Sequence, residues 1–171
     1  MRAPSLQILS VESTFGSHGW HCELLEGRDV IRASFNAHHT RIQLHAQSYT
    51  PINALAVVGE SPLPVSEEHI PYLLELLCRA NKYLNLGSFE YDLDRQFMVF
   101  RITNIFEKER YDADIVTSMV HCAIAELDRI MPYAMIVQRT PEDLLDDLDI
   151  ERLLQREDLI PPVPGDEDDL P

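Results

Sequence analysis

The sequence has little positive charge. Its 14 lysines and arginines stand against 29 aspartates and glutamates, which gives a formal net charge of -15 at pH 7. A nucleic-acid binder presents a basic face that displaces counterions from phosphate. A protein that docks on an anionic membrane needs clusters of lysine and arginine. The shortage of bases therefore argues against both, and we expect neither nucleic acid nor a membrane as a partner.

Cysteine, glycine and long apolar runs are also scarce. The three cysteines, Cys22, Cys78 and Cys122, form no C-x-x-C pair, so we expect no disulfide framework and no zinc ribbon, and interpret them as reduced, buried hydrophobes. The six glycines are scattered and form no phosphate-binding loop. No apolar run approaches the roughly 18 residues that cross a bilayer, and the N-terminal residues lead into no signal-peptide segment. We expect a cytoplasmic protein.

The acidic residues gather towards the C-terminal end. Residues 142–171 contain twelve acids and two bases, a net charge of -10, whereas residues 1–141 contain seventeen acids and twelve bases, a net charge of -5. A length of 171 residues fits one domain. The sequence therefore indicates an ordinary globular body with a strongly acidic extension.

Hydrophobic periodicity predicts a helix, four antiparallel strands, a helix, a hairpin and a second long helix. Pro132 is expected to end or kink that long helix. Thr140 as N-cap and Pro141 at the first helical position predict a last helix that runs to about Arg156. The predicted ranges are, in order, a helix at 5–15, strands at 20–26, 29–35, 40–49 and 52–60, a helix at 66–84, strands at 88–92 and 96–103, and a helix from 112.

The junction between the middle helix and the hairpin carries a family resemblance. The segment LCRANKYLNLGSFEYD at residues 77–92, followed by FMVFR at 97–101, resembles the helix-to-hairpin junction of the YbjN-like family. In that family an Asn-containing helix end precedes a glycine, an aromatic residue and an acidic hairpin, which corresponds here to Asn81, Gly87 and Phe89. The strand WHCELLEG at 20–27 and the helix end DRIMP at 128–132 are similar too.

The resemblance covers about residues 5–138 and implies an α+β fold like that of type III secretion chaperones, a twisted antiparallel sheet with helices packed on it. Those chaperones are small acidic homodimers that bind client segments, and YbjN-like proteins are linked to stress responses and regulation. The chain is accordingly divided into a YbjN-like α+β domain at 1–139, an acidic amphipathic C-terminal helix at 140–160, and a disordered tail rich in proline and acids at 161–171.

Candidate catalytic and metal-ligating residues form no recognisable pattern. No pair of histidines has the spacing of a zinc finger or of H-E-x-x-H. His121 and Cys122 are neighbours, but on a helix they diverge by about 100° and cannot act as a nucleophile and base together. Asp92 and Asp94 fit a hairpin turn, since aspartate hydrogen-bonds its own backbone two residues on. We predict no catalytic residue, no metal site and no cofactor.

The acidic helix predicted at 140–160 carries an incomplete apolar stripe, which makes it a candidate partner-binding element. The stripe can fold back on its own domain or its twin in a dimer, the usual fate of an amphipathic helix, or it can dock in the groove of a partner with a basic rim. Its members are Leu144, Leu145, Leu148, Leu153 and Leu154.

The sequence as a whole favours a non-enzymatic, chaperone-like or regulatory protein-binding module, stress-related and homodimeric, that binds a client or partner protein of unknown identity. The alternative is a regulatory adaptor that binds one fixed partner through its acidic C-terminal helix. An enzyme of unknown class is the third possibility.

Overall fold

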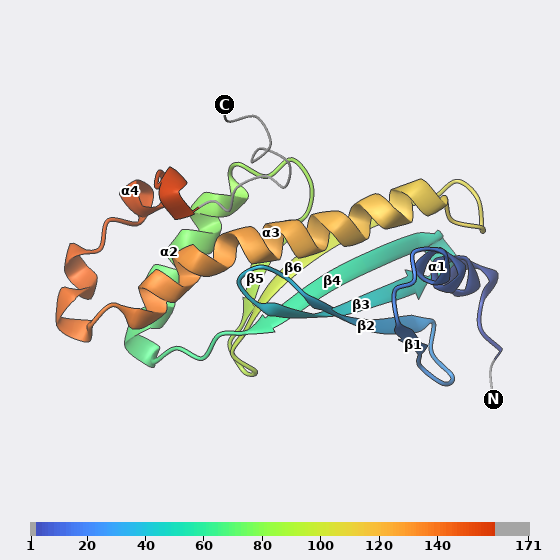
Figure 1. The fold of residues 1–171 in the computed structure, drawn as a ribbon, viewed down its shortest axis with the longest axis horizontal. Helices are drawn as coiled ribbons and strands as arrows, with labels where there is room; N and C mark the ends of the chain where they lie inside the picture. Colours follow the sequence, from blue (N-terminus) through green and yellow to red (C-terminus); the bar gives the residue numbers. More distant parts are fainter. Residues whose placement is uncertain (1–2, 160–171) are drawn as a thin grey trace, which may run out of the picture.

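A six-stranded antiparallel sheet with the strand order β1-β2-β3-β4-β6-β5 lies at the centre of the fold. The computed structural model describes residues 3–159 of the chain. Helices lie against one face of the sheet, with the longer α3 crossing it (Figure 1). The strands are β1 (Cys22–Leu24), β2 (Val30–Asn36), β3 (Arg41–Tyr49), β4 (Ala54–Pro62), β5 (Ser88–Asp92) and β6 (Phe97–Ile105). The α-helices are α1 (Leu6–Ser17), α2 (Ile70–Asn81), α3 (Ala113–Arg139) and α4 (Ile150–Leu154).

Alternation along the strands decides which face of the sheet the helices cover. In β3 the apolar Ile42, Leu44 and Ala46 are buried, while Gln43 and Gln47, at alternating positions, are exposed. Because successive side chains on a strand point to opposite faces, the apolar set meets the helices and the polar set faces away. α3 packs over β4 and β6, α1 packs beside α3 over the first three strands, and α2 lies against β5. The predicted order of elements through α3 is confirmed.

Helix α3 passes through Pro132. The prediction was that this proline ends or kinks the helix. It does not end the helix, since α3 continues to Arg139, and the kink stays a prediction. An interior proline removes a backbone hydrogen bond and costs about 3 kcal/mol. Beyond it, however, Tyr133, Ala134 and Val137 are between 0% and 2% exposed. Burial of a large apolar side chain contributes roughly 1.5–3 kcal/mol, so the packing of this last part of α3 outweighs the cost of the proline.

The segment after α3 is not the single helix that the sequence predicted. Thr140 ends α3 instead of starting a new helix, and its hydroxyl donates to the carbonyl of Ile136. The chain then forms a 3-10 helix, η3 (Glu142–Asp147), and the short α4, with Leu148 extended between them.

Two buried residues explain this break. Leu145 and Ile150 are both 3% exposed. In one continuous helix, residues five positions apart point about 140° away from each other. The extended link turns both side chains to the core, and Asp149 then caps α4 by accepting a hydrogen bond from the backbone N–H of Arg152. The tail predicted at 161–171 lies outside the described residues.

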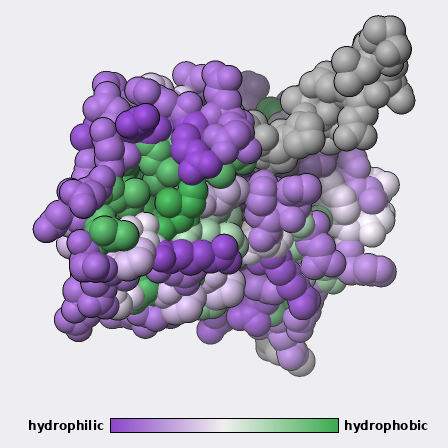
Figure 2. Space-filling model, turned by 60° about the vertical axis from the view of Figure 1, so that its left-hand side comes forward, coloured by the Kyte–Doolittle hydropathy of each residue, from purple (hydrophilic) through white to green (hydrophobic). Residues whose placement is uncertain are grey.

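The surface is mostly hydrophilic, as expected for so acidic a sequence. At the end of the molecule that lies to the left in Figure 1, however, a hydrophobic area is framed by hydrophilic side chains (Figure 2). Within residues 3–159 no helix combines the length and the apolar character needed to span a bilayer.

Candidate functional site

The family-like junction between α2 and β5 is held by Asn81. Its side-chain amide donates to the carbonyl of Phe89 over 3.0 Å and accepts from the N–H of Phe89 over 2.7 Å. Gly87 lies between them with φ +74°, and a Cβ built there would stand 2.5 Å from Cζ of Phe100. The three residues that carry the resemblance therefore shape the turn into β5, and their role is structural.

Beyond this turn, β6 extends farther than its neighbour β5. The last register pair of the two strands joins Ser88 to Arg101, whereas β6 stays paired with β4 as far as Ile105. The positive φ of Gly87 directs the preceding chain away from β6, because a continued strand would need an extended conformation at that residue. Among residues 3–159, no strand therefore lies on the outer side of this end of β6.

An apolar hollow of about 320 Å³ lies beside this end of β6. Two exposed apolar side chains line it: Leu86 is 66% exposed and Ile115 is 42% exposed. Contiguous exposed apolar surface marks interaction sites more often than scattered residues do. We call this the β6-end hollow. Its lining residues are Leu86, Ile102, Thr103, Asn104, Asp114, Ile115, Ser118, Met119 and Cys122.

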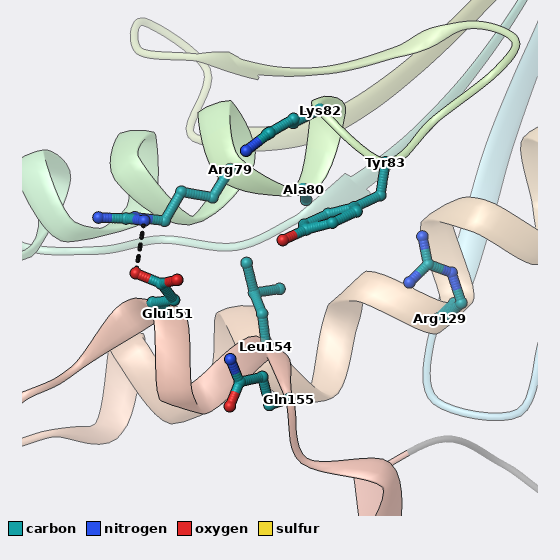
Figure 3. Close-up of a pocket in the computed structure, with 8 residues that line it drawn as sticks. All are labelled: Arg79, Ala80, Lys82, Tyr83, Arg129, Glu151, Leu154 and Gln155. Carbon is teal, nitrogen blue, oxygen red and sulfur yellow. Dashed lines mark hydrogen bonds and ion pairs between the residues drawn. The ribbon is translucent and has the colours of Figure 1, made fainter.

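A second hollow, of about 350 Å³, lies where the ends of α2 and α4 meet α3. In Figure 3 the ring of Tyr83 and the side chain of Leu154 face each other across it, and Arg79 points to Glu151. Arg79 is neutralised locally, since it binds Glu75 at 2.7 Å and Glu151 at 3.3 Å, whereas no ion pair among residues 3–159 includes Lys82, which also lines the hollow. The hydrogen bond that Arg79 donates to Glu75 raises the pKa of Arg79.

The position of Arg79 has a simple electrostatic cause. Arg79 lies in the last turn of α2, where the helix dipole favours positive charge. Arg129 on α3 is paired with Glu126 at 2.6 Å. The paired charges of Arg79 and Glu151 thus stabilise the end of α2 and join α4 to α2.

Most of the predicted partner-binding leucines pack against the core of the chain itself. Leu145 and Leu153 are 3% and 5% exposed, and Leu148 and Leu154 are half-buried against the core. Of the five leucines, only Leu144 is exposed, at 48%. A partner cannot reach Leu145 or Leu153 in this conformation, so the prediction that the stripe binds a partner remains untested and now depends on Leu144.

Polar contacts also fasten the C-terminal segment to the domain. The hydroxyl of Tyr72 donates to Asp146 over 2.6 Å, and that of Tyr133 donates to the carbonyl of Arg156 over 2.9 Å. Nε2 of the buried His69 lies 2.8 Å from the carbonyl oxygen of Thr140. Together with the buried leucines, these contacts make residues 142–159 part of the folded domain.

The cysteines do not form a reactive site. Burial raises the pKa of the Cys22 and Cys122 thiols, with Glu12 and Glu126 adding to the effect, and a raised pKa lowers the thiolate fraction that a nucleophile needs. Cys78 is exposed, so its interpretation as a buried hydrophobe is wrong. It lies on the solvent side of α2, because Leu73, Leu76, Leu77 and Ala80 take the buried face.

The histidines are spread over separate contacts. His18 stacks on Trp20 with ring centroids 4.5 Å apart, and its Nε2 lies 2.9 Å from the hydroxyl of Thr117. His39 binds the carboxylate of Asp128 through its backbone N–H at 2.7 Å. Among residues 3–159 no three His, Cys, Asp or Glu side chains are placed to hold a metal ion together.

Comparison with known proteins supports the fold. No family model matches the sequence, and no curated protein does. Among solved structures, the crystal structure of YbjN from E. coli, a proposed transcription regulator, matches with a TM-score of 0.51 and 8% sequence identity. The match covers 77% of this chain and 88% of that chain. The α+β, YbjN-like fold that the resemblance implied is confirmed, and at this identity the likeness shows the fold alone.

The β6-end hollow was not predicted. Its apolar residues come from three distant parts of the sequence, the turn after α2, the end of β6 and the start of α3. One signal was available: the predicted strands at 88–92 and 96–103 differ in length, so one strand of that hairpin had to extend beyond the other.

Proposed function

We propose that the chain is a non-enzymatic protein-binding module, chaperone-like or regulatory, that binds a partner protein at the β6-end hollow. The observation that carries the proposal is the apolar hollow that Leu86, Ile102, Ile115 and Met119 line beside the end of β6, where no strand among residues 3–159 pairs with its outer side. An apolar surface of this kind gains from being covered, at about 25 cal/mol for each Å² removed from water.

The charge of the chain is consistent with a protein partner. With a net charge of -15, the chain repels nucleic acid and attracts basic protein segments. A regulatory role of the kind proposed for YbjN would then act through protein contacts. The stress-related role, the homodimer and the cytoplasmic location are further parts of this proposal, and light scattering of the purified chain tests the homodimer.

Affinity capture from a lysate of the source cells tests the proposal, with four immobilised proteins compared: the unchanged chain, Leu86→Glu, Ile115→Glu and the control Leu93→Glu. Leu93 is also exposed, at 54%, but it lies in the hairpin at the opposite end of β5. We expect a partner that the chain and Leu93→Glu retain and that the other two variants lose. Equal recovery by all four would overturn the proposal.

A second candidate, the regulatory adaptor, has one observation in its favour. Leu144 is 48% exposed on η3, between Asp143 and the acids that follow. An exposed leucine in an acidic setting suits a partner with an apolar groove and a basic rim. Leu144→Glu tests it in the same capture experiment, since this variant would lose the partner and Leu86→Glu would keep it.

A further inference from the structure

No strand of the described residues lies beside the outward backbone groups at the end of β6. The N–H of Phe106 donates to the carbonyl of Asn53, just before β4, so the backbone of Phe106 faces β4. Because successive residues of a strand direct their N–H and C=O to opposite sides, Thr103 and Ile105 direct theirs away from β4. In the described part of the chain no hydrogen bond reaches these groups, and β5 ends before them.

On the neighbouring β5, a side chain forms hydrogen bonds with the outward backbone groups. Phe89, opposite Phe100, also directs its backbone groups outward, and there the side chain of Asn81 satisfies both of them. Exposed strand edges are templates for added strands, and proteins commonly cover them. The edge is therefore covered at Phe89 and open at Thr103 and Ile105.

From this contrast we infer that the partner segment bound at the β6-end hollow is an extended, non-acidic peptide strand that pairs with Thr103 and Ile105 and continues the line of β5. The inference rests on the proposed function and adds the binding mode. Main-chain hydrogen bonds supply affinity in such strand addition, while pockets for alternate side chains supply selectivity.

The side chains on the two faces of β6 define the sequence of that segment. Ile102 is 6% exposed and points to α3, so a strand residue opposite it enters the β6-end hollow between Leu86 and Met119. The next residue lies on the other face, beside the exposed Thr103. The segment should therefore have apolar residues at alternate positions, and the net charge of -15 disfavours acids in it.

Hydrogen exchange of the full chain with a panel of synthetic peptides tests the inference. The panel holds acetylated and amidated octapeptides with varied apolar residues at alternate positions and lysine at both ends. A matched set carries N-methyl groups at the residues whose N–H would face β6. We expect unmethylated peptides to slow exchange at the amides of Thr103 and Ile105 by at least tenfold, and their methylated copies to leave it unchanged.

Two variants at Thr103 test whether its outward N–H binds the peptide. Thr103→Pro removes an outward N–H that makes no bond to β4, so an edge strand tolerates it, and it should abolish peptide binding. Thr103→Val keeps the N–H and should bind. If Thr103→Pro does not fold, the comparison of methylated and unmethylated peptides on the unchanged chain still shows whether the peptide binds by strand addition.

Several outcomes would overturn strand addition. These are equal binding of both peptide sets, no protection at Thr103 and Ile105 with any peptide, or a light-scattering mass that Thr103→Pro halves, which would place a second copy of the chain on this edge. If any of these occurs while Leu86→Glu still loses the captured partner, protein binding at the hollow stands and only the strand mode fails. If Leu86→Glu keeps the partner, the proposed function fails itself.

Discussion

The amide of Asn81 completes the edge of β5 by exchanging two hydrogen bonds with the backbone of Phe89, at 2.7 Å and 3.0 Å. One side chain at the end of α2 thus takes the place of a neighbouring strand. The contact ties the helix to the sheet edge and leaves the end of β6 as the adjoining open stretch.

Asn81→Ala should therefore destabilise the chain. It leaves the N–H and carbonyl of the buried Phe89 without their partner, and an unsatisfied buried group costs about 1–3 kcal/mol. Denaturant unfolding measures the change in the free energy of unfolding. Lys82→Ala is the matched control, because Lys82 is exposed and none of the described residues forms an ion pair with its ammonium group. Equal stability of the two variants would contradict the role of Asn81.

Gly87→Ala should destabilise the chain by more than about 1 kcal/mol, since a Cβ at φ +74° is strained and meets Phe100 at 2.5 Å and the carbonyl of Arg101 at 2.8 Å. Gly16 in α1 gives the opposite case: nothing lies within 4 Å of its Cβ position, so Gly16→Ala should stabilise by about 0.5–1 kcal/mol. Thermal and denaturant unfolding compare the two. A neutral effect at Gly87 would show that the turn can adopt another conformation.

Leu153→Ala should cost about 2–5 kcal/mol, the usual range for a buried leucine, because this side chain is 5% exposed within the core. Leu144→Ala, at 48% exposure, should change stability by less than about 0.5 kcal/mol. Denaturant unfolding of both variants measures the difference. A small effect at Leu153 would mean that α4 detaches from the domain at little cost.

The stability of the chain should fall on mild acidification because of His45. Burial lowers the pKa of His45 below its ordinary 6.5, Arg32 and Arg95 add to this, and Glu60 opposes it. The unfolded chain then binds a proton at a pH where the folded chain does not. The contribution of His45 is therefore complete above pH 6.5 and is lost as the pH falls through the lowered pKa.

The variant His45→Gln should remove this part of the pH dependence. Unfolding free energies measured on both sides of pH 6.5 should decline less for His45→Gln than for the unchanged chain. His21→Gln, a change at an exposed histidine, serves as the control and should keep the original slope. A slope that does not change in His45→Gln would contradict the assigned cause.

The sequence predicted the order of the elements better than their contacts. The helix at α1 was expected, but which of its side chains lie inside was not, since Leu6 and Leu9 are exposed while Ser10 is buried. The hydroxyl of Ser10 accepts the backbone N–H of Tyr111 and donates to the carbonyl of Gln7. Satisfying a buried serine through a residue 101 positions away is a tertiary effect that periodicity cannot reveal.

The candidate site, too, could be predicted only in part from the sequence. The roles of Asn81 and Gly87 could be anticipated, because a local turn depends on neighbouring residues. The leucines after Thr140 could be recognised as an apolar stripe, but their burial depended on a break at Leu148 that helical periodicity does not predict. The β6-end hollow needed the register of β5 and β6, which only the folded chain provides.

Site-specific photo-crosslinking tests the central claim of protein binding at the β6-end hollow most directly. Benzoylphenylalanine replaces Leu86 in one form of the full chain and Leu93 in another, and both are illuminated in the source cells. Binding at the hollow predicts a discrete crosslinked polypeptide from position 86 that is absent from position 93. The same products from both positions, or none from position 86, would contradict it.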